Sequence, residues 1–189
     1  MKQAQTIQQE RTTNGVAVDK LADTVELVKH NPAMAQFRFR AKNRWENGSL
    51  NRSEIKGFYG AGQEDATRTQ AFVLTNDEAP ILLGGDKGPN PVEYLLNALA
   101  GCMTTTMVYH AALQGIDIEG IESELEGELD LRGLLQLDPN IRQGFSNVKV
   151  NFKVKSSAKA ELLKELAQRS PVYDMMVNPV PVKLTVEKA

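Results

Sequence analysis

The chain has 189 residues, of which 41% are hydrophobic and 24% charged, and its 22 basic and 24 acidic residues give a formal net charge of -2. This length suits one domain with a substantial core and is short for two. The balanced charge, without a basic run, argues against a nucleic-acid partner. No apolar stretch of about 18 residues could cross a membrane, and the N-terminus carries no apolar segment, so we expect a cytoplasmic protein.

The single cysteine, Cys102, limits the disulfide and metal chemistry open to the chain. One cysteine cannot form a disulfide within the chain, and the two histidines are well separated in the sequence. These residues do not make a recognisable zinc site. We therefore expect no bound metal and no cofactor.

The N-terminal part differs from the rest of the chain. Its first 15 residues are polar and predict a disordered tail. Apolar residues then recur at helical spacing, at Val18, Leu21, Val25 and Val28. Pro32 ends this pattern, which predicts a short amphipathic helix. We predict a tail and short helix over residues 1–34 and a single domain over residues 35–189.

A β-hairpin is predicted next. Aromatic and basic side chains alternate over residues 37–42, and Glu46-Asn47-Gly48 supplies a turn. A loop rich in Gly, Ala and Asp follows. A third strand over residues 67–77 and a glycine-rich loop complete this part of the chain.

A long helix is predicted from Pro91 to Gln114. Asn90 is a suitable N-cap, Glu93 stands three residues after it as in a capping box, and Gly115 is a typical helix end. Apolar residues cover most of the circumference of this helix, so it should be central. Because one subunit cannot cover so many apolar sides, we expect an obligate homodimer.

Alternating patterns return after this helix, over residues 116–129 and 145–156. The outer face of the first is acidic and that of the second basic, so we predict that the two strands pair antiparallel. A second helix from Ser156 or Ser157, a helical turn after Pro171 and a final strand from Val180 follow. This order predicts an α+β fold rather than a doubly wound sheet.

Cys102 has two interpretations. A lone cysteine on an apolar helix is usually a small buried hydrophobic residue. A reactive cysteine must form a thiolate, which in the middle of a helix requires a positive neighbour from elsewhere in the fold. The available donors lie on the first hairpin, where they otherwise form a solvated strand face: Arg38, Arg40, Arg44 and Arg52.

Glu93 and His110 share the helix with Cys102 but lie out of its reach within one chain. At about 1.5 Å rise per residue, Glu93 is roughly 13 Å and His110 about 12 Å from Cys102 along the axis. A hydrolase or acyl-transfer function through Cys102 therefore lacks a nearby base. Two antiparallel copies of the helix could bring Glu93 of one subunit near Cys102 of the other, which would place a site at a dimer interface.

Two segments resemble the OsmC/Ohr family of thiol peroxidases: NPVEYLLNALAGC on the long helix and SPVYDMMVNPVPVKLTV near the C-terminus. The resemblance covers roughly residues 35–187. It implies an intertwined α+β homodimer with antiparallel sheets around a long central helix. It also implies that a cysteine on this helix attacks an organic hydroperoxide and becomes sulfenate. A second cysteine before a Pro-Val pair then forms a disulfide with it, while an arginine and a glutamate set the reactivity of the first thiol.

Carried over to this chain, the resemblance makes Cys102 the peroxidatic cysteine. Glu93 matches the glutamate, although the best-studied branch has its acid where this chain has Val92. Arg44 and Arg52 are the leading candidates for the arginine, ahead of the other two hairpin arginines.

The resemblance breaks at the resolving cysteine, because Ser170 precedes the Pro-Val pair here. A serine cannot form a disulfide, so an external thiol reductant would have to complete the cycle. Our leading hypothesis is the reduction of organic hydroperoxides through Cys102. The alternative is a non-catalytic dimer of the same fold that binds a small apolar or thiol-containing ligand.

Overall fold

The computed structural model of the chain describes residues 10–188. It divides into two compact units, which are described in turn. Unit 1 contains Ala17–Leu95, and unit 2 contains the chain from Leu96 onward together with Thr12–Val16. Helices and antiparallel sheets occur together, which confirms the α+β class. A single domain over residues 35–189 stays a prediction.

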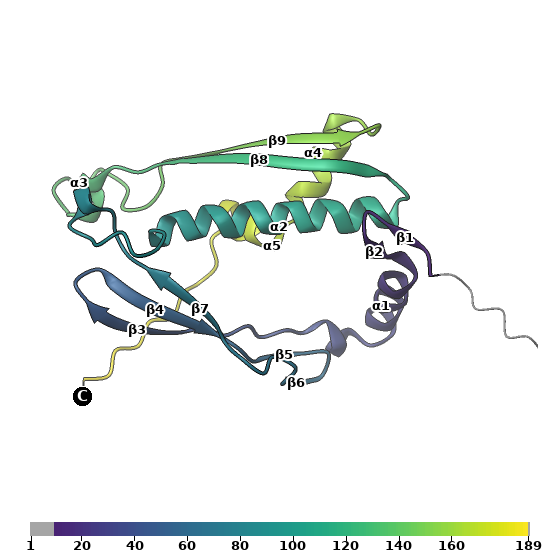
Figure 1. Ribbon diagram of the computed structural model, residues 1–189, viewed down its shortest axis with the longest axis horizontal. Helices are drawn as coiled ribbons and strands as arrows, with labels where there is room; N and C mark the ends of the chain where they lie inside the picture. Colours follow the sequence, from purple (N-terminus) through teal and green to yellow (C-terminus); the bar gives the residue numbers. More distant parts are fainter. Residues whose placement is uncertain (1–9, 189) are drawn as a thin grey trace, which may run out of the picture. The chain divides into compact units, whose positions relative to one another are not determined.

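Unit 1 begins with helix α1, Val18–His30, which is the short helix predicted before Pro32, and the 3-10 turn η1, Pro32–Ala35. Its main sheet has three antiparallel strands in the order β3-β4-β7 (Figure 1). These strands are β3 Lys42–Asn47, β4 Leu50–Ile55 and β7 Phe72–Asn76. The predicted hairpin and third strand are therefore confirmed.

Two parts of unit 1 differ from the prediction. The alternating residues 37–41 form only an isolated bridge, Arg38 with Tyr59, and the rings of Phe37 and Phe39 lie against Phe58. A second hairpin, formed by β5 Phe58–Gly60 and β6 Gln63–Asp65, extends from the end of the predicted hairpin segment into the segment predicted as a loop. Ala61 and Gly62 both have positive φ, +49° and +80°, as a tight hairpin turn requires.

The loop between β7 and the long helix is held by the buried carboxylate of Asp77. This group accepts hydrogen bonds from the Ser49 hydroxyl at 2.6 Å and from three backbone N–H groups, those of Glu78, Gly85 and Lys87, at 2.9 to 3.1 Å. The short 3-10 turn η2, Pro80–Leu82, lies in this loop. The loop thus leads to the helix start in a defined conformation.

Helix α2 spans Pro91–Leu113, so it starts at the predicted residue and ends one residue before the predicted Gln114. Its start is a reciprocal capping box: the Val92 N–H donates to Asn90 Oδ1 at 2.8 Å, and the Asn90 N–H donates to Glu93 Oε2 at 2.9 Å. Gly115, with φ of +67°, follows the last turn. Both predicted end signals are confirmed.

In unit 2, strands β8, Ile118–Glu128, and β9, Asn147–Ser156, pair antiparallel along α2 (Figure 1). The predicted charge complementarity is confirmed, because Glu122 stands opposite Lys153 and Glu126 opposite Lys149. The connection between the strands holds the short helix α3, Leu131–Leu134. The inner faces of the two strands pack against α2.

Two further helices complete unit 2: α4, Ala160–Gln168, and α5, Pro171–Val177. Helix α4 begins later than predicted, because Ser157 and Ala158 form a bend after β9 and Lys159 is the N-cap. The buried core joins α2 to α4 and consists of Leu99, Met103, Met107, Ala111, Leu163, Leu166 and Ala167. Burial of this apolar surface is the main stabilising contribution in the unit.

The two ends of the described chain correct the sequence analysis. Residues 1–9 of the expected disordered tail lie outside the described residues, but the expectation is wrong for residues 12–15. Strands β1, Thr12–Thr13, and β2, Val16–Ala17, form a small hairpin. Its Asn14 side chain donates to the Ile116 carbonyl at 2.9 Å and accepts from the Ile118 N–H at 2.8 Å, which fixes the hairpin to the start of β8.

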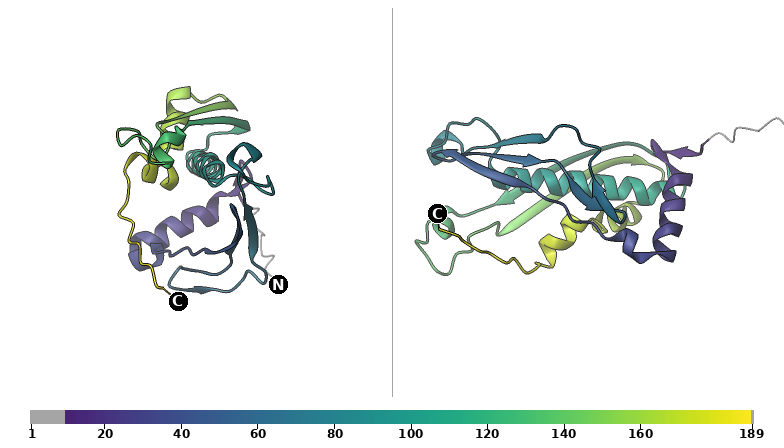
Figure 2. Two further views of the ribbon diagram at one scale, coloured as in Figure 1. Left: turned by 90° about the vertical axis from the view of Figure 1, so that its left-hand side faces the viewer. Right: turned by 90° about the horizontal axis from the view of Figure 1, so that it is seen from below.

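The final strand expected from Val180 is not formed. After α5 the chain runs as an extended segment without a strand partner in the described residues (Figure 2). Its alternating apolar residues are exposed, with Val182 at 87% and Leu184 at 85%. A strand needs a neighbouring edge for its backbone hydrogen bonds, and residues 10–188 offer none to this segment.

Candidate functional site

Cys102 lies in the middle of α2, between the exposed Gly101 and the buried Met103, and is itself partly exposed. Leu99, Met103 and Met107 point into the core, whereas the side of α2 that carries Cys102 is open. We call this side the open face, defined by the exposed or partly exposed residues Leu95, Ala98, Gly101, Cys102, Thr105, Tyr109 and Leu113. The thiol is thus not a fully buried core residue.

The open face is mostly small or apolar. Tyr109 is 48% and Leu95 40% exposed, and Ala98, Gly101 and Thr105 leave the helix backbone accessible between them. Small residues allow another helix to approach closely, and apolar ones gain stability when they are covered. This face is exposed in the single chain, and the expected homodimer stays a prediction.

Glu93 is in the first turn of α2, in unit 1, and its carboxylate is occupied by the capping box with Asn90. Cys102 lies nine residues later on the same helix, in unit 2. The separation of roughly 13 Å expected from helical rise therefore applies to this chain. Glu93 has the structural role of a cap partner, and its assignment as a site residue stays a prediction.

The leading arginines, Arg44 and Arg52, face each other in register on β3 and β4. Both approach Glu46 Oε1, which lies 2.9 Å from Arg52 Nε and 3.6 Å from Arg44 Nη2. The Arg44 side chain is 81% exposed. The structure brings these two arginines together, in unit 1, while Cys102 and Ser170 belong to unit 2.

The other hairpin arginines have local partners. Arg38 lies over the Tyr59 ring, with 4.4 Å between its Cζ and the ring centroid, and Arg40 forms two hydrogen bonds of 2.8 Å with Glu64. Bidentate pairing and ring stacking both restrict a guanidinium. Of the four, Arg44 is therefore the least restrained.

Ser170 is fully buried and caps α5. Its hydroxyl accepts a hydrogen bond from the Tyr173 N–H at 3.2 Å. Pro171 follows at the first helical position, as is common at helix starts. A cap role explains why a small polar residue is tolerated at this buried position, and it is independent of any redox role.

His110 contacts Arg169 rather than Cys102. Its Nδ1 lies 3.4 Å from Arg169 Nη1. Partial burial, and secondarily the Arg169 charge, lower the pKa of His110, which favours the neutral imidazole. A thiol–imidazole pair with Cys102 is therefore not part of this site.

Within residues 10–188, no group of three His, Cys, Asp or Glu side chains could hold a metal ion.

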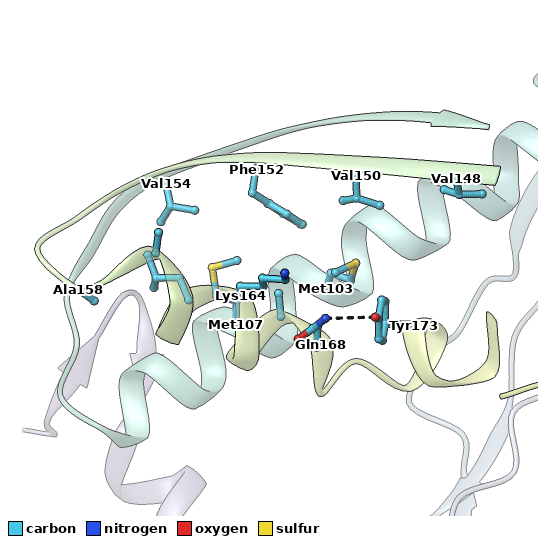
Figure 3. A pocket seen from close by; sticks show the side chains of 13 residues that line it. Met103, Met107, Val148, Val150, Phe152, Val154, Ala158, Lys164, Gln168 and Tyr173 are labelled. Carbon is cyan, nitrogen blue, oxygen red and sulfur yellow. Dashed lines mark hydrogen bonds between the residues drawn. The ribbon is translucent and has the colours of Figure 1, made fainter. Parts of the chain in front are cut away.

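A cavity of about 570 Å³ in unit 2 was not predicted from the sequence (Figure 3). It lies between α2, β9 and α4, and its walls include Met103, Phe152, Lys164 and Tyr173. Three alanines, Ala158, Ala160 and Ala167, contribute to the lining and leave the space open. Ala160 and Ala167 on the leucine-containing helix α4, with Ala158 just before it, are the sequence signal that could have indicated it.

Comparison with protein families shows a match to the model for OsmC-like proteins over residues 84–185, which is more than half of the chain. The chain belongs to the OsmC-like protein family. The match includes Cys102, Ser170 and all of α2, so the resemblance of the central helix and of the Pro-Val segment is confirmed. A comparison with functionally curated proteins found no match.

Solved structures support the OsmC-like fold. An OsmC-like protein from Mycoplasma pneumoniae has 16% identity and a TM-score of 0.57, and the alignment covers 75% of this chain and 89% of that one. An organic hydroperoxide resistance protein from Legionella pneumophila has 18% identity and a TM-score of 0.51, with 79% and 96% covered. At these identities the likeness establishes the fold.

No helix in the part of the chain that the structure describes is long and apolar enough to cross a membrane.

Proposed function

We propose that this OsmC-like protein is a homodimer that reduces organic hydroperoxides through the thiol of Cys102. The observation that carries the proposal is the position of Cys102, partly exposed on the open face of the helix that matches the family. The hydroperoxide resistance named for the Legionella pneumophila relative supports the choice of substrate. The reaction follows from the chemistry of an accessible thiol.

In the first step the Cys102 thiolate attacks one oxygen of the hydroperoxide. A sulfur–oxygen bond forms as the O–O bond breaks, so the sulfur is oxidised by two electrons to sulfenic acid. The departing alkoxide takes up a proton and leaves as an alcohol. Only the thiolate is a good nucleophile, so the rate depends on a nearby positive charge.

Regeneration of Cys102 requires an external thiol, because Ser170 cannot form a disulfide. One small-molecule thiol condenses with the sulfenic acid and releases water, which leaves a mixed disulfide on Cys102. A second thiol attacks this mixed disulfide, releases the Cys102 thiol and forms a free disulfide. Each cycle thus consumes one hydroperoxide and two thiols.

Three parts of the single chain that are left uncovered or unpaired support the homodimer. The open face of α2 is apolar and uncovered in one chain. The β8–β9 sheet has two strands, each with one unpaired edge in the described residues. The segment from Val180 carries four apolar side chains on an extended backbone without a partner: Val180, Val182, Leu184 and Val186. A second copy would supply both a helix face and strand edges.

Within such a dimer, we assign the charge that activates Cys102 to Arg44 or Arg52. Arg44 lies on the edge strand β3 and Arg52 on the neighbouring central strand β4 of unit 1. The one ion pair of Arg44 within residues 10–188 is a long one, 3.6 Å to Glu46. Glu93 is the candidate for the glutamate that, together with the arginine, sets the reactivity of the thiol in the family. Which hydroperoxides and which thiols react with Cys102 then depends on what can reach the open face.

Trapping of the sulfenic acid tests the proposal. Purified protein is treated with one equivalent of cumene hydroperoxide in the presence of dimedone, and the peptide that contains Cys102 is analysed by mass spectrometry. We expect the dimedone adduct on Cys102 and one equivalent of cumyl alcohol, with neither product in a Cys102→Ser variant. An unmodified Cys102 and intact hydroperoxide would contradict the proposal and favour the non-catalytic ligand-binding dimer.

A further inference from the structure

The cavity of unit 2 is large and opens to solvent, because Ala160, Lys164 and Gln168 in its lining are exposed. At about 570 Å³ it falls within the range of about 300–1,000 Å³ that is common for small-molecule sites. A small molecule can therefore enter this space from solvent and find room in it.

The walls of the cavity are apolar and elongated. Four inward-facing residues of β9 form one side, at every second position: Val148, Val150, Phe152 and Val154. From the first to the last they extend about 20 Å along the strand. Met103 and Met107 form the opposite side, and methionine side chains adapt readily to the shape of a ligand. A long, narrow hydrocarbon chain fits such walls.

The polar groups of the lining lie together opposite β9 (Figure 3). Lys164 and Gln168 are one turn apart on α4, and Gln168 Nε2 lies 3.2 Å from the Tyr173 hydroxyl. Within residues 10–188, Lys164 makes no ion pair, whereas Lys149 and Lys155 on the neighbouring strand both do. An ammonium, an amide and a hydroxyl together provide hydrogen-bond donors for one anionic group.

We propose that this cavity binds a single-chain carboxylate, with its hydrocarbon chain along β9 and its carboxylate at Lys164, Gln168 and Tyr173. The positive charge of Lys164 selects a carboxylate over a neutral alcohol of the same length. Cys102 is not among the lining residues. The binding therefore does not depend on the thiol chemistry proposed above, and the two can fail separately.

Methionine-methyl NMR tests the proposal at the site itself. The chain has six methionines, of which Met103 and Met107 line the cavity and Met34 serves as a reference in unit 1. Decanoate is titrated into protein labelled with 13C at the methionine methyls. We expect saturable shifts of Met103 and Met107, with a Kd on the order of 10–100 µM, and no shift of Met34.

Two substitutions separate the carboxylate site from the chain site. Lys164→Met should weaken decanoate binding about tenfold and leave the binding of decanol unchanged, because only the charge-assisted contact is lost. Lys153→Met removes the same charge from the outer face of β9 and is the matched control, with no expected effect. Ala158→Phe should fill one end of the cavity and abolish the Met103 and Met107 shifts, in a variant whose thermal unfolding shows that it is folded.

Three results would overturn the proposal. One is the absence of any Met103 or Met107 shift with decanoate. Another is equal binding of decanoate by wild type and Lys164→Met, which would show that no carboxylate is recognised. The third is an undiminished shift in folded Ala158→Phe, which would place the ligand outside the cavity.

Discussion

Cys102 and Met103 are consecutive on α2 but face different surroundings. Met103 is 5% exposed and lines the cavity of unit 2, whereas Cys102 is partly exposed on the open face. Successive residues of a helix are about 100° apart, which is enough to direct one side chain inward and the next outward. The helix therefore presents a thiol and an apolar cavity wall on separate sides.

The activation of Cys102 can be tested on the hairpin arginines. We expect that Arg44→Met or Arg52→Met slows alkylation of Cys102 by iodoacetamide at pH 7 about tenfold, equivalent to about 1.4 kcal/mol. Loss of the guanidinium reduces the fraction of thiolate, while methionine keeps much of the packing. Lys42→Met, which removes another exposed charge from β3, is the control. If neither arginine variant differs from this control, the assignment of the activating charge is wrong.

Ser170 offers a test of the resolving position. In Ser170→Cys, one equivalent of cumene hydroperoxide should remove two free thiols and form a disulfide, provided that the Cα atoms come within about 7 Å. Ser170→Ala is the control, because it also loses the cap of α5, at a cost of about 1 kcal/mol, but keeps a single thiol. Two titratable thiols that persist after the hydroperoxide has been consumed would show that this position does not resolve Cys102.

The homodimer can be weakened through the open face. Thr105→Glu places a charge on that face, and burial of an unpaired charge at an interface is costly. We expect the dimer to dissociate at least about a hundredfold more readily, equivalent to about 2.7 kcal/mol, in sedimentation velocity. Thr24→Glu makes the same change on an exposed turn of α1. A wild-type monomer at micromolar concentration, or equal dissociation of the two variants, would argue against this interface.

Asp77 should make unit 1 sensitive to acid. The Ser49 hydroxyl, and then the backbone N–H groups of Lys87, Glu78 and Gly85, lower the pKa of Asp77, although burial opposes this shift. The resulting stabilisation is complete above the unfolded value of about 3.9 and is lost as the pH falls through the lowered folded value. Asp77→Asn should therefore unfold at a lower temperature than wild type at pH 7, and the difference should shrink below about pH 4. A difference that stays constant with pH would contradict this role.

The sequence predicted the parts of the fold that depend on local signals. The capping box of α2 is formed by neighbours in the chain, and the charge pattern of β8 and β9 identified each as the partner of the other. The β5–β6 hairpin was missed because Ala61, in the left-handed region, gives no turn signal of its own. The strand expected from Val180 was predicted from the alternation of apolar and polar residues. This alternation indicates an apolar face, but it does not show whether a neighbouring strand is present to pair with the segment.

The candidate site was less predictable for a related reason. Cys102 could be identified from one segment, but its surroundings depend on which surfaces are covered. The cavity arises where α4 and β9, which are neighbours in the chain, meet α2, which is distant from both in sequence. Lys164 is an exposed residue of α4, and its spacing in the sequence already places it one turn from Gln168. Only the packing of α5 brings Tyr173 to Gln168.

Steady-state turnover is the most direct test of the central claim, that Cys102 reduces organic hydroperoxides with electrons from an external thiol. Consumption of cumene hydroperoxide is followed in excess dithiothreitol, with wild type and Cys102→Ser at the same concentration. The account predicts many equivalents of cumyl alcohol per Cys102 in the wild type and only the uncatalysed rate in the variant. Equal rates for the two proteins would contradict it.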